Sequence, residues 1–131
     1  MGEVPIGAVI VDSRTGEIIS RGHNEVILTK DPTAHAEIIT LRRAGEILGS
    51  ERLLHCDLYV SLEPCPMCAH AISLARIRRL YYGAYDPKGG GVDHGARIYN
   101  QDSCHHRPDV YGGLMEHESG DLLRRFFKQR R

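Results

Sequence analysis

Two short motifs rich in metal-ligating residues constrain this chain more than any other feature, because they must meet in space to act together. The first reads His35-Ala36-Glu37, and the second, about 27 residues later, reads Pro64-Cys65-Pro66-Met67-Cys68. One imidazole and two thiolates satisfy three positions of a tetrahedral zinc ion, and a catalytic zinc leaves the fourth position to water. The sequence therefore predicts that His35, Cys65 and Cys68 bind one zinc ion.

Both motifs lie at predicted helix starts, which suits a metal held by thiolates. Cys65 and Cys68 are three residues apart, so they fall on one helix face and can share the ion. The positive ends of two helices favour the thiolate form of cysteine. Glu37 follows His35 by two residues, where it can reach the metal's water without binding the metal. A carboxylate in that place takes and returns protons, so Glu37 is the predicted catalytic residue.

The Cys-x-x-Cys pair taken alone has other interpretations, a redox pair or half of a structural zinc site. A redox pair leaves His35 and Glu37 unexplained, and a structural site needs a fourth protein ligand. The segments that offer one are His55-Cys56 and Cys104-His105-His106. We interpret Cys56 as a small buried apolar residue, and a second metal site at 104–106 stays open.

The length of the chain indicates one domain, and its net charge excludes some classes of binding partner. The chain has 131 residues and a formal net charge of zero, which excludes a grossly basic nucleic-acid binder, although the last eight residues are strongly basic. The N-terminus lacks a basic segment followed by an apolar stretch, so we expect no secretory signal and a cytoplasmic location. Membrane contact is not expected, because the apolar runs are too short to span a bilayer. We expect a single domain over residues 1–131.

The spacing of apolar residues predicts alternating strands and helices. Strand patterns occur at residues 7–12, 17–23, 57–62 and 79–82. Helical patterns run from Asp31-Pro32-Thr33 to Gly49, over 67–75, and over 121–128 near the C-terminus. Residues 86–108 are rich in Gly, His and Asp, which is typical of a long functional loop. This order predicts an α/β fold around a mixed sheet.

Nearly the whole chain resembles the bacterial tRNA adenosine deaminases, zinc enzymes that convert the wobble adenosine of tRNA to inosine. The similar segments are 3–9, 31–38, 58–65, 75–77 and 126–127, and the two motifs match the zinc deaminase signature. The resemblance implies a three-layer α/β/α cytidine deaminase-like fold with a mixed central sheet of about five strands. It also implies hydrolytic deamination, the tRNA anticodon stem-loop as partner, and a homodimer whose contact lies near Cys65–Ala75. Family members usually carry an amphipathic helix before the first strand, whereas this chain begins just in front of that strand.

The resemblance also assigns roles to single residues beyond the zinc ligands and Glu37. Asn24 matches the asparagine that hydrogen-bonds the flipped base. Asp86 and Lys88 match a loop beside the nucleotide's sugar, where a carboxylate that accepts from the ribose 2′-hydroxyl favours RNA over DNA. The remaining substrate contacts that the resemblance implies are Ala34, His106 and Phe127.

Three other functions stay open at this point. Deaminases of free guanine or cytosine share the zinc motifs almost verbatim, so the motifs do not discriminate between substrates. Leu62 stands where guanine deaminases tend to have Cys, and an aromatic and basic C-terminus suits a splayed RNA loop. An engineered adenine deaminase of single-stranded DNA is the second alternative, against which Asp86 argues. The third is a nucleic-acid-binding or metal-storage module without catalysis, which would release no ammonia.

Overall fold

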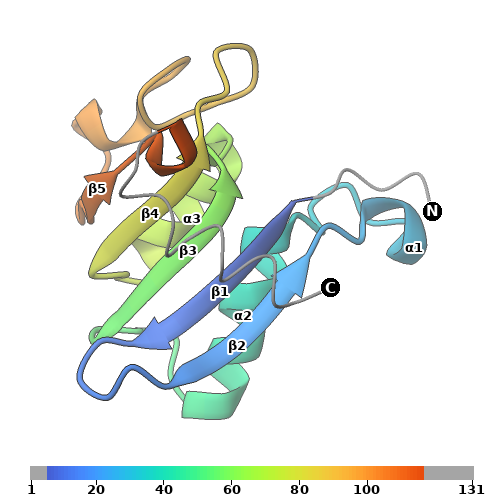
Figure 1. Cartoon of the computed structure of the whole chain (residues 1–131), viewed down its shortest axis with the longest axis vertical. Coiled ribbons are helices and arrows are strands. Elements are labelled where there is room, and N and C mark those ends of the chain that lie inside the picture. The colour runs from blue at the N-terminus through green and yellow to red at the C-terminus, as the bar shows by residue number, and fades with distance from the viewer. Residues whose placement is uncertain (1–5, 117–131) are drawn as a thin grey trace.

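The computed structural model describes residues 6–116, and its centre is a mixed five-stranded sheet (Figure 1). The strands are β1 (Gly7–Asp12), β2 (Ile18–His23), β3 (Cys56–Leu62), β4 (Arg79–Ala84) and β5 (Asp109–Tyr111), in the order β2-β1-β3-β4-β5. β1 pairs antiparallel with β2 and with β3, whereas β3, β4 and β5 are parallel neighbours. The predicted mixed sheet of about five strands is confirmed.

Two helices cover one face of this sheet. They are α2 (Ala36–Leu48) and α3 (Pro66–Leu74), and the shorter elements are α1 (Val26–Thr29) and the 3-10 turns η1 (Ile98–Asn100) and η2 (Leu114–Glu116). α2 and α3 contact each other, and their buried residues share one apolar core with the sheet, so both lie on the same side (Figure 1). Gly49 ends α2 in the left-handed conformation, with φ of 65°, as its glycine predicts. Neither of these helices, nor any other in the described residues, is long and apolar enough to cross a membrane.

The structure corrects the predicted start of the long helix. Asp31-Pro32-Thr33 does not begin α2, which starts at Ala36. The Asp31 carboxylate instead accepts hydrogen bonds from the backbone N–H of Thr33 at 2.9 Å and from its hydroxyl at 2.7 Å. The Asp31 side chain thus caps this local turn, four residues before the observed N-cap, and His35 becomes the residue that precedes the helix.

Two short elements were not predicted from the sequence, and one predicted helix lies outside the described residues. α1 and β5 have four and three residues, too few to show a period. β5 pairs with β4 and lies directly after the long predicted loop. The predicted helix over 121–128 lies outside the residues that the structure describes.

Candidate metal centre and its cavity

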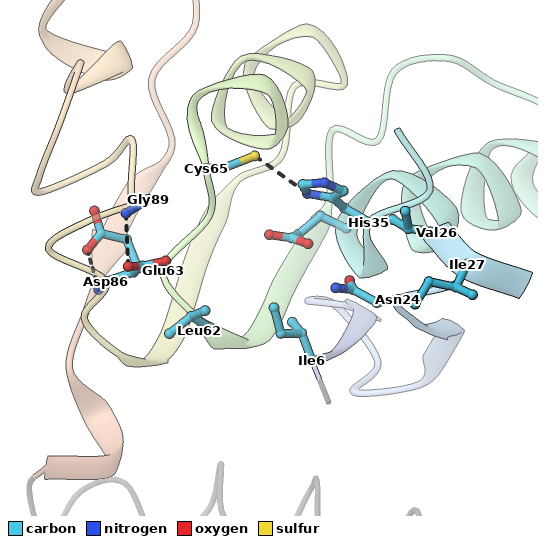
Figure 2. Close-up of a pocket in the computed structure, with 11 residues that line it drawn as sticks. Ile6, Asn24, Val26, Ile27, His35, Leu62, Glu63, Cys65, Asp86 and Gly89 are labelled. Atoms are coloured by element: carbon cyan, nitrogen blue, oxygen red, sulfur yellow. Dashed lines mark hydrogen bonds between the residues drawn. The ribbon is translucent and has the colours of Figure 1, made fainter. Parts of the chain in front are cut away.

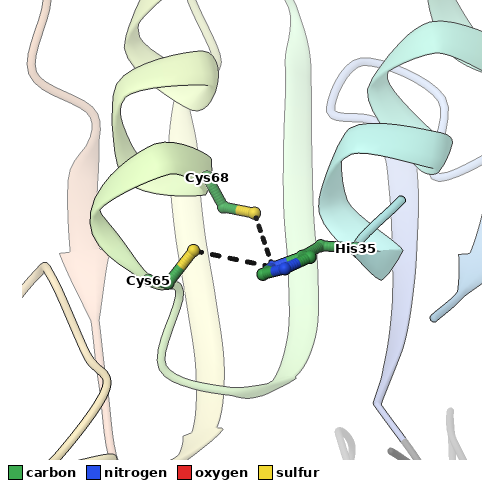
Figure 3. A group of neighbouring side chains, drawn as sticks. All are labelled: His35, Cys65 and Cys68. Atoms are coloured by element: carbon green, nitrogen blue, oxygen red, sulfur yellow. Dashed lines mark hydrogen bonds between the residues drawn. The ribbon is translucent and has the colours of Figure 1, made fainter. Parts of the chain in front are cut away.

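His35, Cys65 and Cys68 converge on one point, as the sequence predicts (Figure 3). The Nδ1 atom of His35 lies 3.6 Å from the Sγ of Cys65 and 3.6 Å from the Sγ of Cys68. A tetrahedral zinc with Zn–S of about 2.3 Å and Zn–N of about 2.0–2.1 Å places nitrogen and sulfur about 3.6 Å apart. The donor set and its spacing therefore fit one Zn²⁺ ion. Within residues 6–116, no other group of three His, Cys, Asp or Glu side chains is arranged to hold a metal.

Two helix N-termini supply these ligands. His35 is the N-cap of α2 and Cys65 is the N-cap of α3, and both have extended backbone angles. Pro66 occupies the first turn of α3, a position where its missing N–H costs nothing, and Cys68 follows on the same turn. A hydrogen bond from Cys68 lowers the pKa of the Cys65 thiol to about 5, and the same contact raises the pKa of Cys68. All four cysteines are free thiols, so the chain presents Cys65 and Cys68 as ligands rather than as a disulfide.

Cys104, the residue of the alternative metal segment, packs elsewhere. Its thiol lies 3.3 Å from the hydroxyl of Ser73 and 3.1 Å from the carbonyl oxygen of His106. These contacts bind the end of the long loop to α3. The residue is buried and has a packing role in this arrangement.

Glu37 lies in the first turn of α2, beside the cluster, and is only 4% exposed. Burial raises the pKa of this carboxyl to about 7. A group that titrates near neutral pH can both accept and donate a proton, which is what a general acid–base catalyst requires. The structure thus places Glu37 where the sequence predicts its proton-transfer role.

The raised pKa of Glu37 predicts a pH-dependent stability of the metal-free protein. Because the folded pKa of about 7 exceeds the ordinary 4.5, the folded state holds the proton more tightly between these values. The protonated Glu37 carboxyl therefore stabilises the folded state fully below pH 4.5, and this contribution is lost as the pH rises to about 7. The loss of free energy of unfolding is up to about 3 kcal/mol. We expect metal-free Glu37→Gln to match the wild type at pH 4.5 and to exceed its free energy of unfolding at pH 8. Urea denaturation in a chelator, at both pH values, measures this difference, and equal stabilities at pH 8 would contradict it.

A cavity of about 370 Å³ opens beside the cluster (Figure 2). Its lining residues are Ile6, Asn24, Val26, Ile27, His35, Glu37, Leu62, Glu63, Cys65, Asp86 and Gly89. Its apolar wall comes from the residue before β1, from α1 and from the end of β3, and its polar wall comes largely from the metal cluster and the loop after β4. A flat ring with polar edges fits such a site, because apolar side chains contact its faces and polar groups contact its edges.

Asn24 lies in this cavity, as predicted, and also has a structural partner. Its Oδ1 accepts the backbone N–H of Ala36 at 2.7 Å, so it caps the start of α2 from outside the helix. This bond orients the side-chain amide, and Figure 2 shows Asn24 at the cavity edge, near Ile6. Its contact with a base stays a prediction.

Asp86 also lines the cavity, whereas Lys88 does not. The Asp86 carboxylate accepts the backbone N–H of Gly89 at 2.9 Å and that of Lys88 at 3.3 Å, which closes the turn after β4. The side chain of Lys88 is exposed outside the lining residues. The predicted pair is therefore divided between the cavity wall and its surroundings.

Two other implied substrate contacts, Ala34 and His106, are not among the residues that line the cavity. Ala34 is buried next to His35 in the chain and is not a lining residue. The Nε2 of His106 donates to the carbonyl oxygen of Ile77 at 2.7 Å. Ile77 precedes β4, so His106 lies at the end of that strand opposite to the cavity, where it fixes the long loop. Its contact with substrate stays a prediction. Phe127 lies outside the described residues.

Glu63 is the site residue that the sequence reasoning missed. It lines the cavity, and five hydrogen-bond donors of the loop after β4 surround its carboxylate. Burial acts to raise the pKa of Glu63, but hydrogen bonds from Asp86 and His94 outweigh it and lower the pKa. The one signal in the sequence is an acid directly before Pro64-Cys65.

Comparison with known proteins adds to this geometry. Residues 1–84 match the family described as the cytidine and deoxycytidylate deaminase zinc-binding region. The tRNA-specific adenosine deaminase of Agrobacterium fabrum is 60% identical over 129 residues, which cover 98% of this chain and 84% of the relative. A solved structure from a study of A-to-I editing by tRNA:A34 deaminases has a TM-score of 0.79 at 60% identity and covers 82% of each chain. Guanine deaminase from Bacillus subtilis has a TM-score of 0.61 at 35% identity, covering 95% of this chain and 78% of that one.

Proposed function

This chain belongs to the tRNA-specific adenosine deaminase family, and from that premise we propose that it hydrolyses the exocyclic amine of adenosine at wobble position 34 of tRNA, which gives inosine and ammonia. The observation that carries this proposal is the His35–Cys65–Cys68 group beside a cavity that contains a buried glutamate. The described residues share one sheet and one core, which supports a single deaminase domain over the chain. A tRNA substrate supports a place in the cytoplasm.

The mechanism follows from what each side chain is placed to do. His35, Cys65 and Cys68 would hold the zinc ion, which when bound acts as a Lewis acid and makes water nucleophilic near neutral pH. Glu37 accepts one proton of the attacking water and gives it to the purine ring nitrogen, and it then carries the second proton from the added hydroxyl to the departing amine. Its burial keeps bulk water from competing for that proton. Asn24 is held by α2 in an orientation from which its amide can bond the base.

Mass spectrometry of three candidate substrates tests the proposed function. An RNA anticodon hairpin, the same hairpin as DNA, and free guanine are each incubated with the purified zinc-loaded protein. Conversion of adenine to hypoxanthine adds about one mass unit. We expect this shift in the RNA hairpin at position 34 and no change in guanine. Deamination of guanine with an untouched RNA hairpin would overturn the proposal, and equal rates on RNA and DNA would overturn its RNA part.

We also propose that the enzyme is a homodimer that joins along the groove between α2 and α3. The groove is largely apolar and has a volume of about 490 Å³, and Ile38, Leu41, Leu53 and Leu74 contribute to its lining. The side chain of Leu74 is 64% exposed there, which is costly unless a second surface covers it.

Substituting the exposed leucine of this groove should separate the subunits. A buried carboxylate at an apolar interface lacks a partner and is strongly disfavoured, so we expect Leu74→Glu to be a monomer. The control is Leu28→Glu, which changes a residue 75% exposed on α1, outside that groove. Light scattering coupled to size exclusion gives the molar mass of each variant. A dimeric Leu74→Glu, or a monomeric wild type, would contradict the proposed interface.

A further inference from the structure

The carboxylate of Glu63 accepts several backbone hydrogen bonds from one loop, residues 86–94. It is 2% exposed, and it lies directly before the metal-binding segment. Its Oε2 accepts the N–H groups of Val92, Asp93 and His94 at 3.2, 2.9 and 3.0 Å. Its Oε1 accepts the N–H of Asp86 at 3.0 Å and lies 2.8 Å from the Nδ1 of His94. One buried side chain therefore holds both ends of residues 86–94.

The same loop packs so closely against the metal-binding segment, residues 64–68, that its glycines leave no space for a side chain. A Cβ atom at Gly90 would lie 2.4 Å from the Oε2 of Glu63, which is closer than any real contact. The backbone N–H of Gly91 donates to the carbonyl of Pro64 at 2.8 Å, and a Cβ there would lie 2.5 Å from the nitrogen of Pro66. The loop thus touches the residues on both sides of Cys65. These backbone contacts hold the metal-binding segment independently of the Glu63 carboxylate.

We propose that Glu63 is a positioning residue, which fixes the loop wall of the substrate cavity and so controls how well substrate binds. This inference rests on the proposed function. Glu63 acts on the cavity through Asp86. It accepts a hydrogen bond from the Asp86 backbone N–H, and the Asp86 side chain lines the cavity together with Gly89. Glu37 lies by the metal ligands at the start of α2 and moves the proton. Loss of the Glu63 contacts should therefore raise the KM much more than it lowers the kcat.

Replacing this carboxylate by an amide disturbs one particular contact. In Glu63→Gln, one acceptor oxygen becomes an NH2 group. The Nδ1 of His94 can accept from that group by changing its tautomer, so the amide nitrogen is best placed where Oε1 was. There it faces the N–H of Asp86, donor against donor, whereas the three bonds to Oε2 can persist. The substitution displaces residue 86 from the cavity wall and leaves the metal ligands in place.

Steady-state kinetics on the RNA anticodon hairpin, with zinc content measured on the same samples, tests this inference. We expect Glu63→Gln to raise the KM about 10- to 100-fold, the range that loss of a hydrogen bond to a charged group gives. The kcat should stay within a few-fold, with zinc at one ion per chain. The matched control, Glu46→Gln, makes the same chemical change on the exposed surface of α2 and should leave both constants unaltered.

A second variant disturbs the contact between Glu63 and the loop by changing the loop instead of the carboxylate. It tests the positioning role even if Glu63→Gln fails to fold. Gly90→Ala leaves the carboxylate intact but pushes the loop away from it, so its KM should rise as well. A wild-type KM in Gly90→Ala, or a fall of kcat and zinc content at constant KM in either variant, would overturn the positioning role. An inactive wild type would instead refute the proposed function, which keeps the two failures apart.

Discussion

Glu37→Gln should abolish deamination of the RNA hairpin while the protein keeps its zinc. Glutamine has nearly the same size, so the fold persists, but its amide neither takes a proton from water nor returns one. Removal of an acid–base group lowers the rate about 10²- to 10⁴-fold, and we expect the kcat to fall by at least that factor. Burial raises the pKa of Glu37 to about 7, which makes this side chain the appropriate proton carrier at neutral pH. Single-turnover assays and metal analysis measure the two quantities.

The control for this prediction is Glu46→Gln, because Glu46 lies on the same helix but on its exposed surface. It should deaminate at the wild-type rate. If Glu37→Gln kept more than a tenth of the wild-type kcat, another group would have to carry the proton. If it lost zinc, the residue would be part of the metal's support rather than the acid–base catalyst.

Cys65→Ser should lose both the metal and the activity. A serine hydroxyl is a poor zinc ligand near neutral pH, whereas the Cys65 thiol, whose pKa is lowered to about 5, binds as a thiolate. Zinc content should fall well below one ion per chain, and deamination should fall below detection. Because metal binding is coupled to folding, the thermal midpoint should fall too. The effects are read by metal analysis, activity assay and calorimetry.

A second cysteine in the chain provides the control for the loss of metal. Cys104→Ser changes a buried thiol that contacts Ser73 and lies outside the cluster. It should keep its zinc and stay active. Retention of zinc and activity in Cys65→Ser, or loss of zinc in Cys104→Ser, would show that the ligands have been misassigned.

The metal ligands were predictable from the sequence because their spacing and chemistry are local. A pair of thiols three residues apart at a helix start faces one side whatever surrounds it, and His35 directly precedes the other helix. Strands β1 to β4 were predictable for a similar reason, since β1, β3 and β4 are largely apolar runs and β2 follows a turn with alternating residues.

The role of Glu63 was not predictable in this way. Its partners lie 23 to 31 residues further along the chain, and they are mostly backbone N–H groups, which leave no mark on the sequence. The bond of the His106 ring was not predictable either, because a histidine in a polar loop gives no sign that its ring bonds the backbone of Ile77. Three-residue β5 is defined by its pairing with β4, a property of the assembled sheet.

The bond between Asn24 and the first N–H of α2 has a consequence for how freely this site can change. The side chain proposed to read the base also anchors the helix that begins with Ala36 and carries Glu37. A substitution that removes the side-chain oxygen gives up a helix cap worth about 1 kcal/mol as well as the base contact. Asp has the same shape and would retain an oxygen acceptor at this place. One side chain thus serves both the base contact and the start of α2. A substitution at this position that changes which base is preferred must also keep the hydrogen bond to α2.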